Sequence, residues 1–110
     1  MGWQRSIDKV LRPIGLTHTR FLVLDAAAQA FERLDDAVSQ AKIAEVAGID
    51  EASTSRIARR LEQDGLIDRG PDGVDARYWR VIVTREGYGL LRLARPVVDA
   101  AAARFFARGA

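Results

Sequence analysis

The sequence predicts a single domain that is mainly α-helical, with one small two-stranded β-hairpin and a long helix near its C-terminal end. Apolar residues recur at spacings of three and four over most of the chain, as they do on the buried side of amphipathic helices. Between residues 39 and 65, two short segments each carry a helix start signal and a helix stop signal. Residues 77–84 show instead the two-residue alternation of a β-strand.

The composition bounds the possible functions. A chain of 110 residues that is 48% hydrophobic can bury one small core. It holds no apolar run long enough to cross a membrane and no secretory signal, so we expect a cytoplasmic, nucleoid-associated protein without a membrane partner. The absence of cysteine excludes disulfides and thiolate zinc sites. We expect no cofactor, no metal and no catalytic site, and we expect the single histidine, His18, to be a solvated surface residue.

Charge is distributed unevenly along the chain. The net charge of +2 is a weak argument for nucleic-acid binding. Residues 25–52 hold seven acids and two bases, whereas residues 53–85 hold seven bases and five acids. The bases of the chain are fifteen Arg and two Lys, and the forked donors of Arg suit phosphates and guanine edges. A genome rich in G and C would produce the same excess of Arg without any function behind it.

The first third of the chain predicts two helices. Residues 4–11 suit a short amphipathic helix, which Pro13 and Gly15 end. Thr17 is a suitable N-cap for a longer helix over residues 18–34. The predicted buried side of this longer helix consists of Phe21, Leu24, Ala28 and Phe31.

A second pair of helices follows, with a tight turn between them. Ser39 is expected to cap a helix over residues 40–47, which Gly48 ends, and Asp50 is expected to cap the next helix, which ends at Gly65. The first helix of the pair is expected to bury Ile43, Val46 and Ala47. Two short helices joined by a Gly-containing turn form a helix-turn-helix.

The second helix of this pair has two unlike faces. Its apolar stripe consists of Thr54, Ile57, Ala58 and Leu61. Its opposite side is small, hydroxylated and cationic, as a helix that enters a DNA groove requires, and consists of Ala52, Ser55, Arg56, Arg59, Arg60 and Gln63. An ordinary solvated helix face could carry the same residues.

A hairpin follows the helix-turn-helix, with strands over residues 66–69 and 77–84 and a turn-rich segment between them. This order of elements is the winged-helix arrangement, with the wing tip at residues 70–76. The arginines around the tip are Arg69, Arg77 and Arg80. An arginine held on a wing has a physical reason to insert into a narrow, negative minor groove. In an ordinary solvated hairpin, the same arginines would only keep the exposed edge soluble.

Thr84 is expected to cap a long last helix over residues 85–106, which Pro96 should kink or deprive of one hydrogen bond. Its apolar seam consists of Leu91, Ala94, Val98, Ala101 and Phe105. A second apolar edge consists of Leu90, Leu93 and Val97. Since one small core cannot cover both edges, we expect one of them to pack against a second copy of the chain. The alternative is a helix folded back on its own domain.

Three stretches stand in a specific order: IGLTHTRFLVLDA at residues 14–26, VSQAKIAEVAGIDEASTSRIARRLEQDGLIDR at residues 38–69, and DARYWRVIVTREG at residues 75–87. Together they resemble the MarR family of bacterial transcriptional regulators over nearly the whole chain. The most specific parts are the SRIARRLEQDGLIDR run and the D-x-R pair of Asp75 and Arg77. The resemblance implies a winged helix-turn-helix with a long C-terminal dimerisation helix.

The resemblance implies one domain over residues 1–110, in which residues 38–84 form the helix-turn-helix and wing. Residues 1–16 and 88–110 would then form dimerisation or packing helices. The residues expected at the major groove of double-stranded DNA are Ser53, Thr54, Ser55 and Arg56. Those expected at phosphates or around the wing are Arg59, Arg60, Arg69 and Arg77, with Asp75 steadying Arg77.

Members of the family act as homodimers on inverted-repeat operators, often as repressors, and a small aromatic ligand often releases them. In this chain Trp3, Phe21 and Phe105 would line the ligand cleft. Both terminal helices look shorter than usual, so the dimer interface must be smaller or differently built. We expect it to use Trp3, Val97, Phe105 and Phe106. The stretch over residues 26–37 looks longer than usual and is expected to extend the second helix.

Two functions of different classes follow from these observations. The first is a sequence-specific DNA-binding regulator that has no catalytic activity. The second is a winged-helix protein-interaction module, or a truncated relative that forms unproductive heterodimers. The two differ in the effect expected of Arg77→Ala, which should remove DNA affinity from a regulator and change almost nothing in an interaction module.

Overall fold

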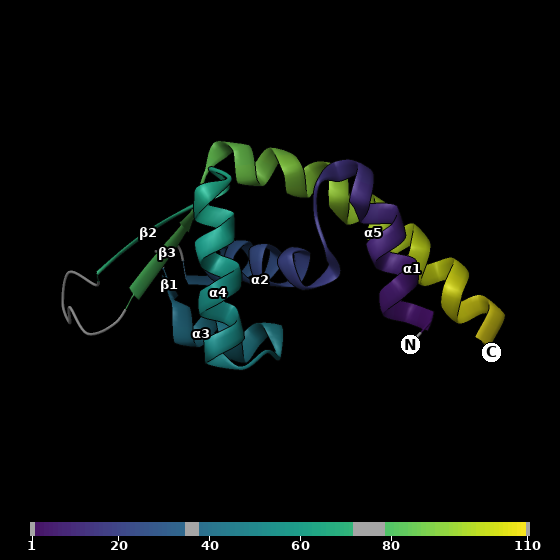
Figure 1. Ribbon diagram of the computed structural model, residues 1–110, viewed down its shortest axis with the longest axis horizontal. Helices are drawn as coiled ribbons and strands as arrows, with labels where there is room; N and C mark the ends of the chain where they lie inside the picture. The colour runs from purple at the N-terminus through teal and green to yellow at the C-terminus, as the bar shows by residue number, and fades with distance from the viewer. Residues whose placement is uncertain (1, 35–37, 72–78, 110) are drawn as a thin grey trace.

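The computed structural model describes residues 2–34, 38–71 and 79–109, and its fold is mainly helical, as predicted (Figure 1). In chain order the elements are α1 (Gly2–Leu11), a short 3-10 helix (Arg12–Ile14), α2 (His18–Leu34), β1 (Val38–Ser39), α3 (Gln40–Ala47), α4 (Glu51–Gln63), β2 (Ile67–Pro71), β3 (Trp79–Val83) and α5 (Arg85–Gly109). None of the helices in these ranges is both long and apolar enough to cross a membrane.

Local capping sets the bounds of the helix-turn-helix that α3 and α4 form. The side chain of Ser39 accepts a hydrogen bond from the backbone N–H of Lys42 at 3.1 Å. The side chain of Asp50 accepts one from the backbone N–H of Ser53 at 2.7 Å. Gly48 ends α3 in the left-handed conformation, with a φ of 72°. The predicted caps and the predicted bounds of α3 are therefore confirmed.

The wing belongs to a three-stranded antiparallel sheet with the order β1-β3-β2. Strands β2 and β3 form the predicted hairpin, with Ile67 opposite Val83 and Pro71 opposite Trp79. The third strand, β1, was not predicted. It is only two residues long, too short for any alternation to reveal it, and it exists because Val38 pairs with Val81 on β3.

Helix α2 lies at the centre of the core and packs against α3, α4, α5 and the sheet (Figure 1). It reaches Leu34, so the extension predicted for residues 26–37 is confirmed as far as the structure describes that stretch. One expected core residue is wrong: Val46 on α3 is 39% exposed, and Ala44 is buried in its place. The reason is that α3 turns Ile43 and Ala44 inward, which leaves Val46 at the edge of its buried face.

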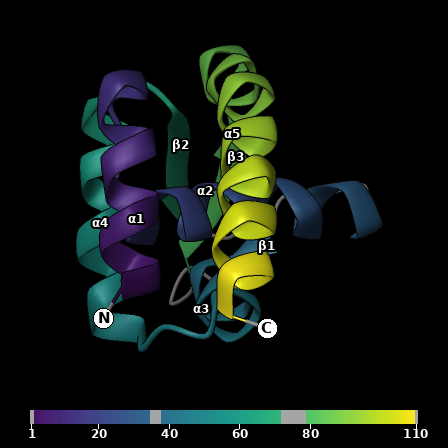
Figure 2. The ribbon, with the colours of Figure 1, turned by 90° about the vertical axis from the view of Figure 1, so that its right-hand side faces the viewer.

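Helix α5 is long and bends in its middle, where Pro96 lies inside it (Figure 1). Its predicted seam is covered by the chain itself: Leu91, Ala94 and Ala101 are buried. Helix α1 packs along the C-terminal half of α5, and both chain ends lie at the same end of the molecule (Figure 2). On the second apolar edge Leu93 is 63% exposed, whereas Leu90 and Val97 are half-buried, so the domain leaves this edge only partly covered.

Candidate nucleic-acid interface

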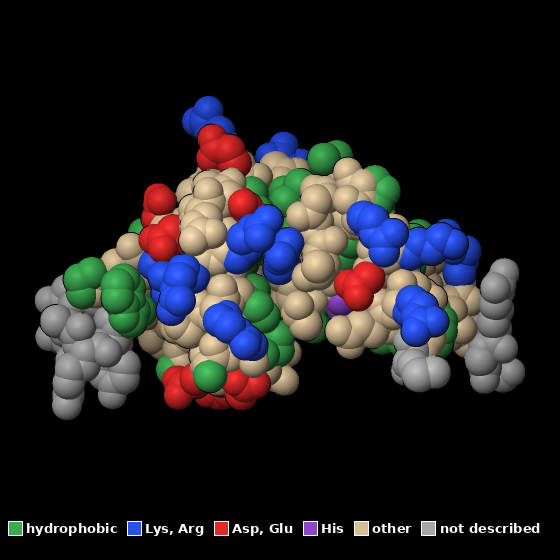
Figure 3. All heavy atoms as spheres, viewed as in Figure 1, with side chains coloured by type: hydrophobic (Ala, Val, Ile, Leu, Met, Phe, Trp, Pro, Cys, Tyr) green, Lys and Arg blue, Asp and Glu red, His purple; other side chains and the backbone are tan. Residues whose placement is uncertain are grey.

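The outward face of α4 is the main cationic surface of the helix-turn-helix. Thr54, Ala58 and Leu61 bury the opposite face, and this orientation leaves Arg56, Arg59 and Arg60 exposed. Figure 3 shows basic side chains along this helix and acidic side chains gathered at its lower end. Three of the seven bases in residues 53–85, namely Arg56, Arg59 and Arg60, therefore form a cationic strip along α4.

The arginines of this strip are held only weakly by their own chain. The guanidinium of Arg56 donates to the Ser53 hydroxyl at 3.1 Å, and that of Arg60 donates to the Asp64 carboxylate at 3.2 Å. Arg59 makes no hydrogen bond or ion pair within the described part of the chain. Exposed pairs of this kind contribute at most about 1 kcal/mol, so these side chains can exchange their partners for phosphate oxygens at little cost.

The N-terminal end of α4 is negatively charged. Hydrogen bonds from the backbone N–H and the hydroxyl of Ser53 to the Asp50 carboxylate lower the pKa of Asp50 below its ordinary value. Glu51 adds a second exposed acid in the first turn. Both carboxylates complement the positive end of the helix dipole. Because they occupy the N-terminal end of α4, the cationic strip begins only after the first turn, at Arg56.

Thr54 does not belong to the DNA-facing set that the resemblance implied. Its side chain is fully buried, and its hydroxyl has no hydrogen-bond partner among the described residues. It lies in the apolar stripe that packs α4 onto the domain, so no groove can reach it. Ser53 and Ser55, on either side of Thr54, are half-buried and keep part of their surface outward.

Arg69 also differs from its expected role. Its side chain is 9% exposed, and its Nε and Nη2 atoms each lie 3.2 Å from Oε1 of Glu62. Its Nη1 donates to the side-chain oxygen of Gln40 at 3.1 Å, and its guanidinium lies 5.0 Å from the ring centroid of Trp79. These contacts turn Arg69 toward the protein and leave little of its side chain exposed to solvent.

The described part of the wing is its base. Asp75 and Arg77, the acid and the arginine expected at the minor groove, lie outside the described residues, as does most of the expected tip at residues 70–76. The base of the wing is described as far as Pro71 and Trp79, which lie opposite one another. Arg80, the third arginine expected near the tip, is half-buried on β3.

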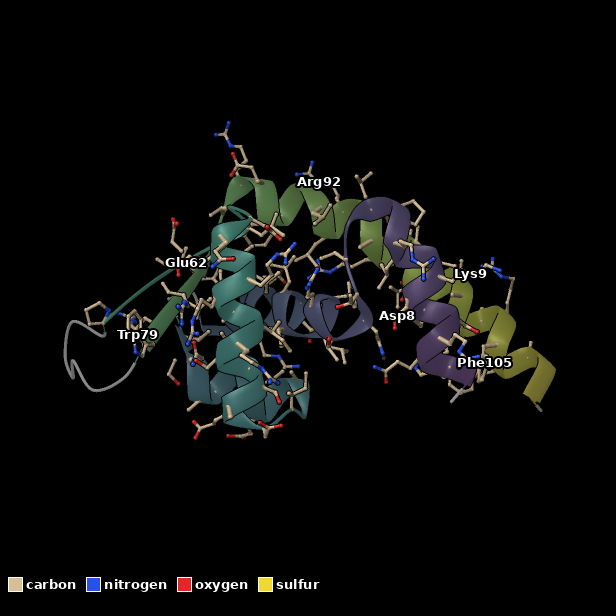
Figure 4. All side chains as sticks on the ribbon, viewed as in Figure 1. Asp8, Lys9, Glu62, Trp79, Arg92 and Phe105 are labelled. Carbon is tan, nitrogen blue, oxygen red and sulfur yellow. The ribbon has the colours of Figure 1, made fainter. Side chains whose placement is uncertain are left out.

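The expected aromatic ligand cleft is only partly present. Phe21 is 5% exposed and belongs to the core, so its inclusion was wrong: α2 turns this ring inward. Trp3 and Phe105 do meet, with ring centroids 5.4 Å apart, and Phe106 lies 5.1 Å from Trp3. Phe105 also borders a surface groove of about 420 Å³ between α1 and α5, which is lined by Ser6, Lys9, Val10, Ala101, Arg104 and Phe105 (Figure 4).

His18 is not the solvated residue that its position suggested. Its ring packs edge-on against Trp3 at a centroid distance of 6.0 Å, and its backbone N–H donates to Oδ1 of Asp8 at 2.7 Å. Its Nδ1 atom is buried without a hydrogen-bond partner among the described residues. Burial lowers the pKa of His18, and the negative charge of Asp8 acts in the opposite direction.

Three functional candidates escaped the sequence analysis, namely Gln40, Glu62 and Trp79, which hold Arg69. One signal could have indicated that Arg69 has such partners, without identifying them. Ile67 and Arg69 are two residues apart on one strand, so they lie on the same face, and Ile67 is apolar. An arginine on a buried face requires partners. The described residues contain no group of three or more acidic, histidine or cysteine side chains that could hold a metal ion.

Comparison with known proteins gives consistent results. A sequence model of the MarR family matches residues 14–77. The chain is 30% identical over 106 residues to the uncharacterised HTH-type transcriptional regulator YdcH of Bacillus subtilis (strain 168). The alignment covers 96% of this chain and 71% of YdcH.

Solved structures resemble the fold over almost its whole length. A MarR-family transcriptional regulator from Rhodococcus sp. RHA1 superposes with a TM-score of 0.83 at 30% identity, covering 96% of this chain and 71% of that one. CouR from Rhodococcus jostii RHA1, solved with p-coumaroyl-CoA, gives 0.81 at 30% identity with the same coverage. The M. tuberculosis transcriptional regulator MOSR, solved with DNA, superposes with a TM-score of 0.80 at 26% identity, and the match covers 94% of this chain and 71% of MOSR.

Proposed function

Because this chain belongs to the MarR family of transcriptional regulators, we propose that it binds an inverted-repeat DNA operator as a homodimer and acts as a repressor. The observation that carries the proposal is the cationic strip of α4, whose three arginines stand exposed opposite a fully buried face. A relative at 26% identity, MOSR, has been solved with DNA, which supports the same use of the fold here.

Each residue of the strip has a proposed task. Ser53, Ser55 and Arg56 approach base edges in the major groove, where Arg can bind guanine through two hydrogen bonds. Arg59 and Arg60 bind phosphates, which supplies affinity that falls as salt rises. The wing residues Arg77 and Asp75 are proposed for the adjacent minor groove on the resemblance alone. Affinity would come mostly from the phosphate contacts and specificity from the base contacts.

The second copy of the chain would cover exposed apolar side chains along α5. Leu93 and Phe106 of α5 are 63% and 59% exposed, Val97 of α5 is half-buried, and Trp3 of α1 is half-buried against Phe106. Large apolar side chains with such exposure favour an interface. A two-fold dimer would place its two α4 helices about 34 Å apart, one turn of B-DNA, which explains the inverted repeat.

A small aromatic anion is the proposed effector. The groove between α1 and α5 combines the Phe105 ring and Val10 with the cationic side chains of Lys9 and Arg104. This lining suits a ligand with one aromatic end and one negative end. CouR, at 30% identity, has been solved with p-coumaroyl-CoA, an aromatic and anionic molecule. Binding there is proposed to lower operator affinity. The protein would act in the cytoplasm, at the nucleoid.

The test of DNA binding is a titration at two salt concentrations. It uses a duplex from upstream of the protein's own gene, with an unrelated duplex as competitor. We expect Arg56→Ala to weaken specific binding by about 1–3 kcal/mol, whereas Arg92→Ala should leave it unchanged. Arg92 is the matched control because it is an exposed arginine on α5, away from α4 (Figure 4). Equal binding of both duplexes by the wild-type chain would contradict a sequence-specific regulator.

The second candidate function is a winged-helix protein-interaction module. The specific observation in its favour is the acidic N-terminal end of α4, formed by Asp50 and Glu51, which opposes close approach of phosphates. Arg77→Ala separates the two functions. It should remove DNA affinity with the fold intact in a regulator, and it should leave partner binding almost unchanged in an interaction module.

A further inference from the structure

We propose that Arg69 is a positioning residue, which fixes the wing against the recognition helix α4 without touching DNA itself. The inference rests on the proposed DNA-binding function, and it replaces the expectation that Arg69 contacts DNA. It concerns the cluster of Gln40, Glu62, Arg69 and Trp79, which we call the wing clamp.

The wing clamp joins every element of the helix-turn-helix and the wing. Arg69 extends from β2, Gln40 is the first residue of α3, Glu62 lies in the last turn of α4, and Trp79 begins β3. Two arginine nitrogens lie 3.2 Å from one oxygen of Glu62, a third donates to Gln40 at 3.1 Å, and the guanidinium lies over the Trp79 ring. Figure 4 labels Glu62 on α4 and Trp79 at the base of the wing.

Arginine is the side chain that can make these contacts at once. Its planar fork offers donors in several fixed directions, and its face can stack on an aromatic ring. A lysine could satisfy only one of the partners as a point charge. The Arg69 side chain is 9% exposed and its partner Glu62 is 37% exposed, whereas Arg60 and Asp64 are 53% and 38% exposed. The two pairs therefore differ at the arginine, and the guanidinium of Arg69 is the better shielded from water and salt.

The position of the wing clamp makes it suited to control the wing. Arg69 lies opposite Val81, and only two further residue pairs, ending at Pro71 and Trp79, are described beyond it. A two-stranded hairpin is marginally stable alone, so its direction depends on what holds its base. The clamp therefore couples the orientation of the proposed minor-groove element to α4, which enters the major groove.

The proposal leads to an unusual expectation for Glu62. Glu62→Gln removes a negative charge from the DNA-binding helix, so simple electrostatics predicts tighter DNA binding. Loss of the wing clamp predicts weaker binding. Asp64→Asn is the matched control, because it removes an acid two residues away that pairs with Arg60 instead of Arg69. We expect Glu62→Gln to weaken operator binding about tenfold and Asp64→Asn to leave it unchanged or slightly tighter.

Salt dependence separates positioning from a direct phosphate contact. Arg69→Ala is expected to weaken operator binding about tenfold with the slope of log affinity against log salt unchanged. A slope reduced by about one unit in Arg69→Ala, with Glu62→Gln no weaker than wild type, would overturn the proposal and return Arg69 to the DNA contacts. Glu62→Gln keeps the test decisive if Arg69→Ala fails to fold.

A measurement without DNA distinguishes failure of the wing clamp from failure of the proposed function. In a Trp3→Phe background, Trp79 is the only tryptophan, and it is 47% exposed. Both Arg69→Ala and Glu62→Gln should change its fluorescence emission, because the guanidinium no longer lies over the ring, whereas Asp64→Asn should not. Unchanged emission in both variants would overturn the clamp. If the emission changes in both variants but the wild-type chain binds no DNA, only the proposed function is contradicted.

Discussion

The hydroxyl of Thr84 donates a hydrogen bond of 2.7 Å to the backbone carbonyl of Gly65. This bond connects the residue before α5 to the glycine that follows α4. The same hydroxyl accepts a hydrogen bond from the N–H of Gly87 at 3.0 Å, so Thr84 also caps α5, as predicted. One side chain therefore forms hydrogen bonds both to the residue that follows the recognition helix and to the first turn of the longest helix.

Thr84→Val should destabilise the fold, because it removes both hydrogen bonds and keeps the shape of the side chain. We expect the free energy of unfolding to fall by about 1–2 kcal/mol, as measured by urea denaturation. Thr84→Ser retains the hydroxyl and serves as the control. Equal stability of Thr84→Val and wild type would show that the junction is not held by these bonds.

Gly87 and Gly89 both lie in the first turns of α5, and they should respond oppositely to alanine. A Cβ on Gly87 would lie 2.2 Å from the carbonyl oxygen of Leu66 and 2.7 Å from a methyl of Val83. We expect Gly87→Ala to cost about 1–3 kcal/mol of unfolding free energy through overpacking. Apart from the adjacent residues and the local helix backbone, no atom of the described residues lies within 4 Å of a Cβ on Gly89, so Gly89→Ala should gain about 0.5–1 kcal/mol from helix propensity. Thermal and chemical unfolding measure both, and a tolerated Gly87→Ala would contradict the close approach.

Thr54→Val tests whether Thr54 packs or binds DNA. Its hydroxyl is buried without a partner among the described residues, so replacing it with a methyl should leave stability unchanged or raise it by about 1–2 kcal/mol. Operator affinity should not change. The matched comparison is Ser55→Ala, at the half-buried neighbouring position proposed to face DNA, which should weaken operator binding. A loss of affinity in Thr54→Val at unchanged stability would restore Thr54 to the DNA contacts.

The fold should lose stability on mild acidification through His18. Its pKa in the folded protein is lowered by burial, so the unfolded chain binds a proton more readily as the pH falls below about 6.5. Stability is therefore greatest above that pH, and it decreases as the pH falls from about 6.5 to the folded pKa. His18→Gln should abolish this part of the pH dependence, which is measured by urea unfolding at about pH 7.5 and about pH 5.5. An identical pH dependence in both proteins would contradict this assignment.

Leu93→Glu should convert the proposed homodimer into monomers, because it places a charge on the most exposed large apolar residue of α5. Sedimentation equilibrium measures the change, and affinity for the full inverted repeat should fall more than affinity for a half-site. Val46→Glu is the matched control, since it changes another exposed apolar residue on a different helix, α3. A Leu93→Glu chain that remains dimeric would exclude this edge of α5 from the interface.

Features set by neighbouring residues could be predicted from the sequence. The caps Ser39 and Asp50 and the stop at Gly48 fix α3 and the start of α4 through hydrogen bonds that span three or four residues. The alternation of residues 77–84 likewise placed the last strand, whose described part is Trp79–Val83. In these cases both partners of the interaction lie within a few residues of one another in the chain, and the structure agrees with the prediction.

Features that depend on distant residues could not be predicted in this way. His18 is half-buried because α1 brings Trp3 against it, and β1 forms only because β3 provides its partner. The surroundings of Arg69 depend on Gln40, which is 29 residues away in the chain. A pattern in one segment contains no information on which other segment will cover it, so the buried polar contacts of the candidate site emerged only from the three-dimensional arrangement.

The junction at Thr84 connects the end of α4 to the start of α5, so the orientations of these two helices are coupled. Phe105 lies about 30 Å along this helix from its first residue, at a rise of 1.5 Å per residue. A rotation of about 5° at the junction therefore moves the Phe105 end by at most about 3 Å, because the bend at Pro96 shortens the straight-line distance. Since Leu91 and Ala94 of α5 are buried in the core, such a rotation also carries the residues packed on them, and this packing connects the terminal helices to the angle at which the recognition helix is presented.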